Sequence, residues 1–404
     1  MRKGTRDRQW VQESSLFGED PMAEAVRREI RSVIERLLAE ELAAELGVGP
    51  YARSKARSGY RHGSEERTLS TSWGQAIFDK PRGRLKTPQG SKEFESRLLP
   101  RYQRRSKDVD NEIVAMYLGG VSTRKVKGVL GILGLRQALS ATAVSRVIQT
   151  LKEHFEGWQS RSLAAEEVAY LYLDAIGIRV RLAQKVASRA ILVAVGIRED
   201  GQKVLLGLWS KGSESKEAWK GVLENLVHRG LGRPLLAVID GCAGLRAAVE
   251  EVWAEIEVQR CAVHKLRNLL AHAPKHAYDE VRDDFHAIVY AESEAKAKEA
   301  YQKFLAKCSK LSASVAKSLE EAGEEILTFY RYPKSQWKAL RTTNAIERLN
   351  EEFRRRVKTQ SSLPNEDAVL VLLYGLVASG LVRLRKIDGY RQLWRVIKEK
   401  QWAA

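Results

Sequence analysis

The pattern of apolar and polar positions changes several times along the 404 residues, and each change predicts a different kind of element. In residues 22–47, apolar side chains recur every three or four positions with charged side chains between them. This spacing puts the apolar residues on one face and predicts an amphipathic helix that Gly47 ends. The helix could pack in a core or against a second protomer, so residues 1–50 are interpreted as an N-terminal helical segment with a possible dimerisation role.

Residues 51–106 mix short strand-like pieces with proline, glycine and arginine. The slightly longer stretch 51–110 carries 15 Lys and Arg against 7 Asp and Glu. A solvated or partly disordered linker can have this composition, and so can a basic module that contacts DNA through short strands and exposed loops. Both interpretations stay open at this point.

Residues 107–165 return to helical spacing. Gly119-Gly120 separates a helix ending at Leu118 from a second helix at Ser122–Leu130, with Ser122 as N-cap. A third helix opens at Ser140. Many helical bundles share this rhythm, but two short helices before a Ser/Thr/Arg-rich helix start are also typical of a helix-turn-helix domain. In that arrangement three side chains would face a DNA major groove: Thr142, Ser145 and Arg146.

From residue 166 the spacing becomes that of strands, with runs rich in Val, Ile and Leu. The predicted strands are Val168–Leu173, Gly177–Leu182, Ala190–Arg198, Val204–Trp209 and Leu235–Ile239, with a helix at Ser215–Gly230. Strands, then a helix, then a buried strand with an acid after it predict an α/β layered sheet. Residues 166–245 are therefore interpreted as the first part of a core.

The following residues, 246–340, are mostly helical and charged, and they predict a helical insertion. Helices at Thr343–Val357 and Asn365–Leu381 come next, so residues 341–385 are interpreted as the last part of the core. A basic tail, residues 386–404, ends the chain.

The amino-acid composition indicates what kind of partner the chain binds and in which compartment it works. The net charge is +18, which indicates a polyanionic partner, most commonly nucleic acid, although ribosomal and membrane-surface proteins share this property. Three cysteines without a CxxC pair predict neither a disulfide framework nor a structural zinc site, and they fit a reducing compartment. Neither an apolar signal core nor a bilayer-spanning stretch is evident, so we expect a cytoplasmic protein without membrane contact.

Three acids stand out against this background. Asp174 and Asp240 each end an apolar run, and Glu347 lies in the predicted helix after the insertion. Each alone has an ordinary interpretation: Asp240 precedes Gly241 as a turn residue would, and Glu347 can pair with Arg354 on a helix surface. Together they suit two divalent ions that drive phosphoryl transfer on nucleic acid, because Mg²⁺ prefers carboxylate oxygens.

Four stretches of the chain resemble the IS256 family of bacterial transposases, which are relatives of the eukaryotic Mutator-like transposases. They are Ser122-Thr-Arg-Lys-Val126 with Thr142-Ala-Val-Ser-Arg146, Ile239–Arg246, Gln259–Asn268, and Trp337 with Leu340–Asn350. The resemblance runs over roughly residues 22–385. It implies an RNase H-like catalytic core with an all-helical insertion, preceded by helical and helix-turn-helix DNA-binding domains.

The resemblance also implies a DDE triad of Asp174, Asp240 and Glu347 that holds two Mg²⁺ or Mn²⁺ ions per active site. Such an enzyme binds the terminal inverted repeats of an insertion sequence, cuts at the element ends and joins the 3′ hydroxyl to target DNA. A homodimer is expected because two element ends need two active sites, and a nucleoid-associated location follows from the DNA partner. Ala175 stands where the family usually has Gly, which matters only if that position needs a positive φ.

Further contacts follow from the resemblance. Cys261 and His264 match the family's C-x-x-H element. Two residues cannot close a tetrahedral zinc site, and without the resemblance they would be assigned to a helix face. With it, the groups expected near the active site or on the DNA backbone are His264, Arg260 and Lys265. Independently of the resemblance, the helix of Glu347 also carries Arg348, Arg354 and Arg355, which could bind phosphates beside the metal site or form a solvated helix face. Trp337 could stack on an unpaired base or pack in the core.

Two other functions remain open. The chain could be a catalytically silent DNA-binding protein derived from a transposase, or an RNase H-fold nuclease that only hydrolyses. The three intact acids favour a competent transposase over the silent protein, and the family resemblance argues against simple hydrolysis.

Overall fold

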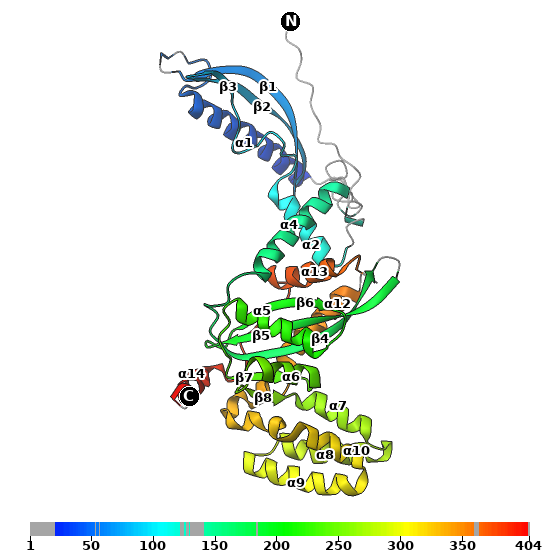
Figure 1. The fold of residues 1–404 in the computed structure, drawn as a ribbon. Coiled ribbons are helices and arrows are strands. Elements are labelled where there is room, and N and C mark those ends of the chain that lie inside the picture. Colours follow the sequence, from blue (N-terminus) through cyan, green and yellow to red (C-terminus); the bar gives the residue numbers. More distant parts are fainter. Residues whose placement is uncertain are drawn as a thin grey trace. The chain divides into compact units, whose positions relative to one another are not determined.

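The computed structural model describes residues 21–52, 54–55, 57–121, 125–126, 129, 141–182, 185–358 and 363–402 (Figure 1). It divides into two compact units, residues 1–151 and 152–404. In the described residues no helix is both long enough and apolar enough to cross a bilayer.

The first unit opens with a helix packed on a small sheet. Helix α1 (Pro21–Leu46) lies against strand β2 of an antiparallel sheet formed by β1 (Gly59–Thr71), β2 (Gly74–Thr87) and β3 (Gly90–Glu93). Leu38 of α1 is buried together with Phe78 of β2. The expected amphipathic helix is confirmed, and part of its apolar face packs within its own unit. The proposed dimerisation role stays a prediction.

Two helices follow, α2 (Lys107–Leu118) and α4 (Ala141–Gln159). Val109 and Ile113 of α2 share a buried cluster with Val144 of α4, so apolar spacing explains their packing. Most of the predicted helix Ser122–Leu130, including its N-cap Ser122, lies outside the described residues, as does the turn before α4. The helix-turn-helix therefore stays a prediction.

The second unit is built on a five-stranded mixed sheet in the order β6-β5-β4-β7-β8. Its strands are β4 (Val168–Leu182), β5 (Lys185–Arg198), β6 (Lys203–Lys211), β7 (Leu236–Ile239) and β8 (Glu257–Arg260). The first three form an antiparallel meander, whereas β7 and β8 run parallel to β4. The expected α/β architecture is thus present as a mixed sheet with helices.

Two expectations about strands were wrong. The predicted strands Val168–Leu173 and Gly177–Leu182 are one strand, β4, because the intervening residues stay in register with β5. Asp174 therefore lies within a strand, opposite Val193, and does not end one. Strand β8 was assigned to the helical region, since its four residues are too few and too polar to show a strand pattern.

Helices cover both faces of this sheet. On one face, α5 (Lys216–His228) and α6 (Ala243–Val252) bury Trp219 and Leu245 against Leu171 and Leu173 of β4. On the other, α12 (Asn344–Lys358) and α13 (Glu366–Ala378) contact β4. Because alternate strand residues point to opposite faces, Asp174 points away from the face that takes Leu171 and Leu173.

A helical region separates β8 from α12 (Figure 1). It contains α7 (Ala262–His272), α8 (Tyr278–Val289), α9 (Glu294–Leu311), α10 (Ala313–Ala322) and α11 (Trp337–Leu340), with short 3₁₀ turns between α10 and α11. A helical region therefore lies where residues 246–340 predicted one, but it begins at Ala262, because α6 and β8 belong to the sheet and its covering layer. The insertion as a separate domain stays a prediction. Helix α14 (Leu393–Trp402) lies in the predicted basic tail.

Candidate active site

The parallel pairing of β4 and β7 brings the first two acids together. Tyr172 of β4 pairs with Val238 of β7. Asp174 and Asp240 each lie two residues beyond this pair, so they are neighbours on the same side of the sheet. At this separation the Asp240 charge raises the pKa of Asp174. Asp240 also accepts a hydrogen bond of 2.9 Å from the backbone N–H of Cys242, as a turn aspartate does.

Asp174 is 7% exposed and sits in an unfavourable place for a charge. Burial raises its pKa to about 6, and the Asp240 charge acts in the same direction. The backbone N–H of Ala175 donates to Oδ1 at 2.9 Å, and the Asn350 amide donates to Oδ2 at 2.7 Å. Ala175 is not among the described residues with positive φ, so the lack of glycine there costs no backbone strain.

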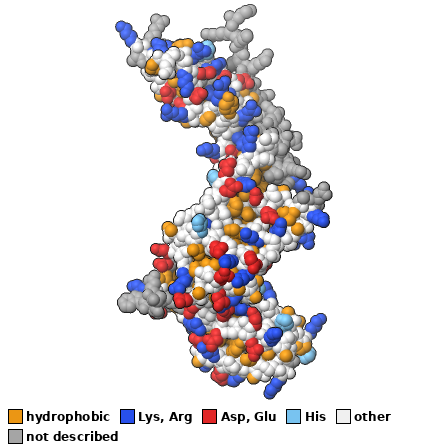
Figure 2. Space-filling view, viewed as in Figure 1, with side chains coloured by type: hydrophobic (Ala, Val, Ile, Leu, Met, Phe, Trp, Pro, Cys, Tyr) orange, Lys and Arg blue, Asp and Glu red, His pale blue; other side chains and the backbone are white. Residues whose placement is uncertain are grey.

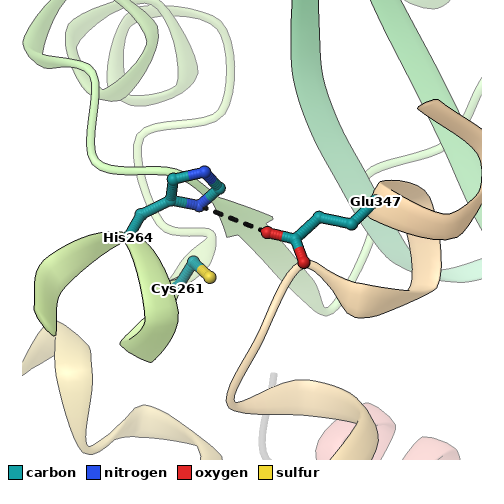
Figure 3. A group of neighbouring side chains, drawn as sticks. All are labelled: Cys261, His264 and Glu347. Carbon is teal, nitrogen blue, oxygen red and sulfur yellow. Dashed lines mark ion pairs between the residues drawn. The ribbon is translucent and has the colours of Figure 1, made fainter. Parts of the chain in front are cut away.

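Glu347 lies in the first turn of α12 and points towards α7 (Figure 3). Its Oε1 lies 3.8 Å from Nδ1 of His264 and 3.3 Å from the hydroxyl of Thr343. Asn350, which binds Asp174, follows three residues later and so shares a helix face with Glu347. Helix α12 therefore docks beside the two aspartates while its glutamate side chain contacts another set of groups.

This second set is a hydrogen-bonded hub centred on the Thr343 hydroxyl. Thr343 is fully buried, and its Oγ1 lies 3.2 Å from Sγ of Cys261 and 3.4 Å from Nδ1 of His264. The hydrogen bond with Cys261 raises the pKa of His264 to about 9, helped by the charges of Asp174 and Asp240. Burial opposes ionisation of Cys261, but its hydrogen bonds with His264 and Thr343 outweigh burial and lower the thiol pKa.

The hub also resembles a metal site in its residue types. In the described part of the chain, Cys261, His264 and Glu347 form the group of metal-binding side chains whose ligand atoms all lie within 4.8 Å of one another. Sulfur, nitrogen and oxygen donors suit zinc better than Mg²⁺. The Thr343 hydroxyl lies 3.2–3.4 Å from an atom of each of the three, so this conformation is stabilised by hydrogen bonds without an ion.

Two basic residues predicted to contact DNA have partners inside the chain. Arg260 donates to Glu321 at 2.5 Å and to Glu325 at 2.9 Å, and Lys265 donates to Glu321 at 2.8 Å. Both side chains are buried. Their DNA contact stays a prediction, and phosphate could reach them only if these ion pairs opened.

Helices α7–α10 show a mixture of basic and acidic side chains on the face in Figure 2. Residues 262–340 carry 13 Lys and Arg and 11 Asp and Glu, so the net charge of this helical region is only +2. Most of the chain's positive charge surplus therefore lies outside the helical region.

The remaining predicted contacts differ in exposure. Trp337 packs against Tyr330 with ring centroids 4.7 Å apart and donates to the Tyr332 carbonyl at 2.7 Å, an arrangement typical of core packing. Its stacking on a base stays a prediction. The other predicted DNA contacts are exposed: Thr142, Ser145 and Arg146 on α4, and Arg348, Arg354 and Arg355 on α12.

Sequence reasoning missed Asn350 and Thr343 as functional residues. Both lie in the Leu340–Asn350 stretch that resembles the family, and Asn350 also falls three residues after Glu347 on the same helix face, so these were the available signals. The partners of Thr343 could not be predicted, since Cys261 and His264 are about 80 residues away in the chain.

Comparisons with known proteins agree with one another. The family model described as "Transposase, Mutator family" matches residues 5–381. The chain is 38% identical over 353 residues to the transposase for insertion sequence element ISRM5 of Rhizobium meliloti (strain 1021), with 87% of each chain covered. It is 30% identical to the transposase for IS256 in transposon Tn4001 of Staphylococcus aureus, over 83% of this chain and 85% of that one.

One similar solved structure is the Drosophila P element transposase strand transfer complex. It matches with a TM-score of 0.30 and 12% identity, over 74% of this chain and 85% of that chain. A likeness at this level carries no argument about the site.

Proposed function

The chain belongs to the Mutator family of transposases, and we propose that it works as a DDE enzyme, with Asp174, Asp240 and Glu347 as its catalytic acids. It would bind the terminal inverted repeats of its element, cleave DNA at the ends and join the 3′ hydroxyl to target DNA. One observation carries the proposal. Two aspartates lie side by side on adjacent parallel strands, and the helix bearing Glu347 is docked onto the first through Asn350.

The sheet topology supports an RNase H-like core. Three antiparallel strands are followed by two strands parallel to the first, in the order β6-β5-β4-β7-β8, and the helical region enters after β8. This order puts Asp174 within the central strand and Asp240 just after its parallel neighbour. The parallel pairing of β4 and β7 thus brings the two aspartates together on one face of the sheet.

The residues present fit Mg²⁺ or Mn²⁺. All three acids offer hard oxygen ligands. Asp174 is a buried carboxylate whose pKa is raised, and the buried Oδ1 of Asn350 has no hydrogen-bond partner, so both would gain from a nearby cation. Asp174, Asp240 and Glu347 would hold two ions, which when bound stabilise the charge that develops at the transferred phosphate and activate the attacking oxygen.

The protein's own groups prepare this arrangement. Asn350 orients Asp174 by donating to Oδ2, and the turn at Cys242 orients Asp240. Glu347 is held by Thr343 and His264, 3.3 and 3.8 Å from its Oε1. Its helix already contacts β4, so the proposed metal site requires the Glu347 side chain to turn from this set towards the aspartates.

Double-stranded DNA is the proposed partner, both as element ends and as target. A homodimer follows from the two-ended substrate, since each end needs its own three acids. The surplus of basic side chains favours polyanion binding, as expected for a protein that works on the nucleoid.

A strand-joining assay tests the triad. Sequencing DNA beside the gene would identify the inverted repeats, and a duplex ending in that repeat with a free 3′ hydroxyl would be incubated with purified protein and Mn²⁺. Asp174→Ala, Asp240→Ala and Glu347→Ala should each abolish joining, whereas Glu299→Ala on the exposed face of α9 should not. Joining that survives loss of any of the three acids would refute the assignment.

The same assay, with a second duplex whose flanking DNA continues beyond the repeat, separates the other two functions. A silent DNA-binding protein would bind both duplexes yet give neither cleaved nor joined product at any metal concentration. A purely hydrolytic nuclease would cleave the second duplex without giving joined DNA.

A further inference from the structure

A basic groove lies beside α12, outside the candidate active site. It has a volume of about 450 Å³ and is bounded by α12, the start of β6 and the segment 381–385 that follows α13. The basic side chains lining it are Lys203, Arg348, Arg355, Arg383 and Arg385, and the acidic ones are Glu351 and Glu352. We call these residues and the apolar side chains between them the basic groove.

The groove uses a different face of α12 from the acids. Successive helix residues are rotated by about 100°, so Arg348 and Arg355 lie about 80–100° around the axis from Glu347 and about 140–160° from Asn350. Arg354, in contrast, falls on the Glu347 face by the same rotation. The predicted phosphate contacts of α12 therefore divide into two sets: Arg354 lies on the face of the acids, and Arg348 and Arg355 line the groove.

The segment after α13 holds its two arginines in a regular row. Val382 is buried and Leu384 partly buried, while Arg383 and Arg385 are exposed, so alternate side chains point inward and outward. The backbone is anchored by Val382, whose N–H donates to Leu376 at 2.9 Å, and by Gln202, which donates to the Leu384 carbonyl at 2.5 Å. Two residues of chain span at most about 7 Å, so the two arginine side chains can reach neighbouring phosphates of one DNA strand.

The positive charge in the groove is poorly neutralised. Lys203 donates to the Ala345 carbonyl at 3.4 Å, and burial together with the nearby Arg348 lowers its pKa. Within the part of the chain that the structure describes, Arg348, Arg383 and Arg385 have no ion-pair partner. Arg355 pairs with Glu352 at 3.0 Å, but this exposed pair is weak and easily exchanged for another anion.

We propose that the basic groove binds the phosphate backbone of a DNA duplex segment distinct from the strand at the catalytic acids. The inference rests on the proposed function, which requires the protein to hold more than one DNA segment. Charges contributed by three separate elements along a groove suit a repeating polyanion better than a single small anion. The row formed by Arg383 and Arg385 would follow consecutive phosphates, and Lys203 and Arg348 would contact the same backbone from the other wall.

The salt dependence of DNA binding tests the groove without any chemistry. Full-length protein would be titrated into a fluorescent duplex in EDTA, with anisotropy measured over a series of salt concentrations. The logarithm of the binding constant falls with the logarithm of the salt concentration, and each lost phosphate contact makes this slope less negative by about 0.9. Arg383→Ala/Arg385→Ala should therefore reduce the magnitude of the slope by about 1.8. Arg383→Glu/Arg385→Glu should reduce it further. Circular dichroism melts would check that both variants fold.

A matched control removes equal charge elsewhere. Lys296→Ala/Lys303→Ala takes two exposed lysines from α9 and should leave the slope unchanged. An Arg383→Ala/Arg385→Ala slope equal to that of the parent, or a loss no larger than that of the control, would overturn the inference.

Two duplexes distinguish the source of the DNA. If loss of affinity is equal for an element-end duplex and an unrelated duplex, the groove binds backbone regardless of sequence, as target or flanking DNA requires. Loss confined to the element-end duplex places that end in the groove.

The outcome is independent of the triad test. If the groove variants keep the salt dependence of the parent while Asp174→Ala abolishes joining, the groove proposal is refuted and the transposase function stands. If the groove variants reduce the magnitude of the slope while joining survives Asp174→Ala, the groove proposal stands and the triad assignment is refuted.

Discussion

Replacing Asp174 by Asn should stabilise the metal-free protein at neutral pH, although it removes a group that the proposed chemistry requires. Burial raises the carboxyl pKa from an ordinary 3.8 to about 6. Because the folded-state value lies above the unfolded one, ionisation penalises the fold. The penalty is absent below pH 3.8, grows as the pH rises and is complete above pH 6. The difference corresponds to about 3 kcal/mol.

The local geometry suits the substitution. Asparagine has the same shape as aspartate, and the buried Oδ1 of Asn350 lacks a partner, so that amide can turn and accept from the new side chain. A gain of about 3 kcal/mol corresponds to a rise of roughly 6–12 °C in melting temperature for a unit of this size. Lost charge-assisted hydrogen bonding will reduce the gain, so these values are upper limits.

The measurement is thermal unfolding of the parent and Asp174→Asn in EDTA at pH 7.5 and pH 4.5. The variant should be more stable than the parent by up to about 3 kcal/mol at pH 7.5 and by only about 1 kcal/mol at pH 4.5, where about a third of the penalty is present. Added Mn²⁺ should raise the melting temperature of the parent and leave that of the variant almost unchanged, by mass action on a site that needs the carboxylate. Asp283→Asn, an exposed acid on α8, is the control. A variant no more stable at pH 7.5, or equally stabilised at both pH values, would refute the reasoning.

Three further substitutions test the site and its support. Thr343→Val removes the hydroxyl at the centre of the hub and should slow strand joining in single-turnover assays with DNA affinity unchanged, while Thr343→Ser should restore the rate; equal rates for both would contradict a positioning role. Asn350→Leu removes a donor to Asp174 and should cost about 1.5–3 kcal/mol of unfolding free energy at pH 7.5 but less at pH 4.5. Glu321→Gln leaves the buried cations of Arg260 and Lys265 without their shared carboxylate and should lower the free energy of unfolding in urea by about 1.5–3 kcal/mol. The control Glu299→Gln on the surface should lower it by less than about 0.5 kcal/mol, and similar losses for both variants would argue against the buried ion pairs.

Much of the fold followed from the apolar pattern of its long elements. Helix α1 has apolar residues at helical spacing, and β5 contains a continuous buried run, Ile191–Ile197. Both form where expected, although β5 begins at Lys185 and not at Ala190. The errors arose where a polar residue interrupts an apolar element or an element is short. Asp174 in β4 resembled a strand end because a carboxylate is rare inside a buried strand. Strand β8 exists through pairing with β7, which local sequence does not encode.

The candidate site was predictable in part for similar reasons. The proximity of Asp174 and Asp240 follows from parallel strands, which apolar runs reveal. The direction of the Glu347 side chain does not, because its contact with His264 depends on how α7 packs against α12. The basic groove could not be predicted from the sequence either, because Lys203 and Arg383 come together only through tertiary structure.

The helical region leaves the core and returns to it at one point. The backbone N–H of Ala262, its first residue, donates to the carbonyl of Arg341, just after its last, at 2.9 Å. Because this hydrogen bond joins its two ends, the region is a closed loop, and its length does not affect where α12 begins. Doubling such a loop costs only about 0.6 kcal/mol in chain entropy. Evolution or an engineer could therefore shorten, lengthen or replace its outer helices, α8 and α9, while Glu347 is still delivered to the same place.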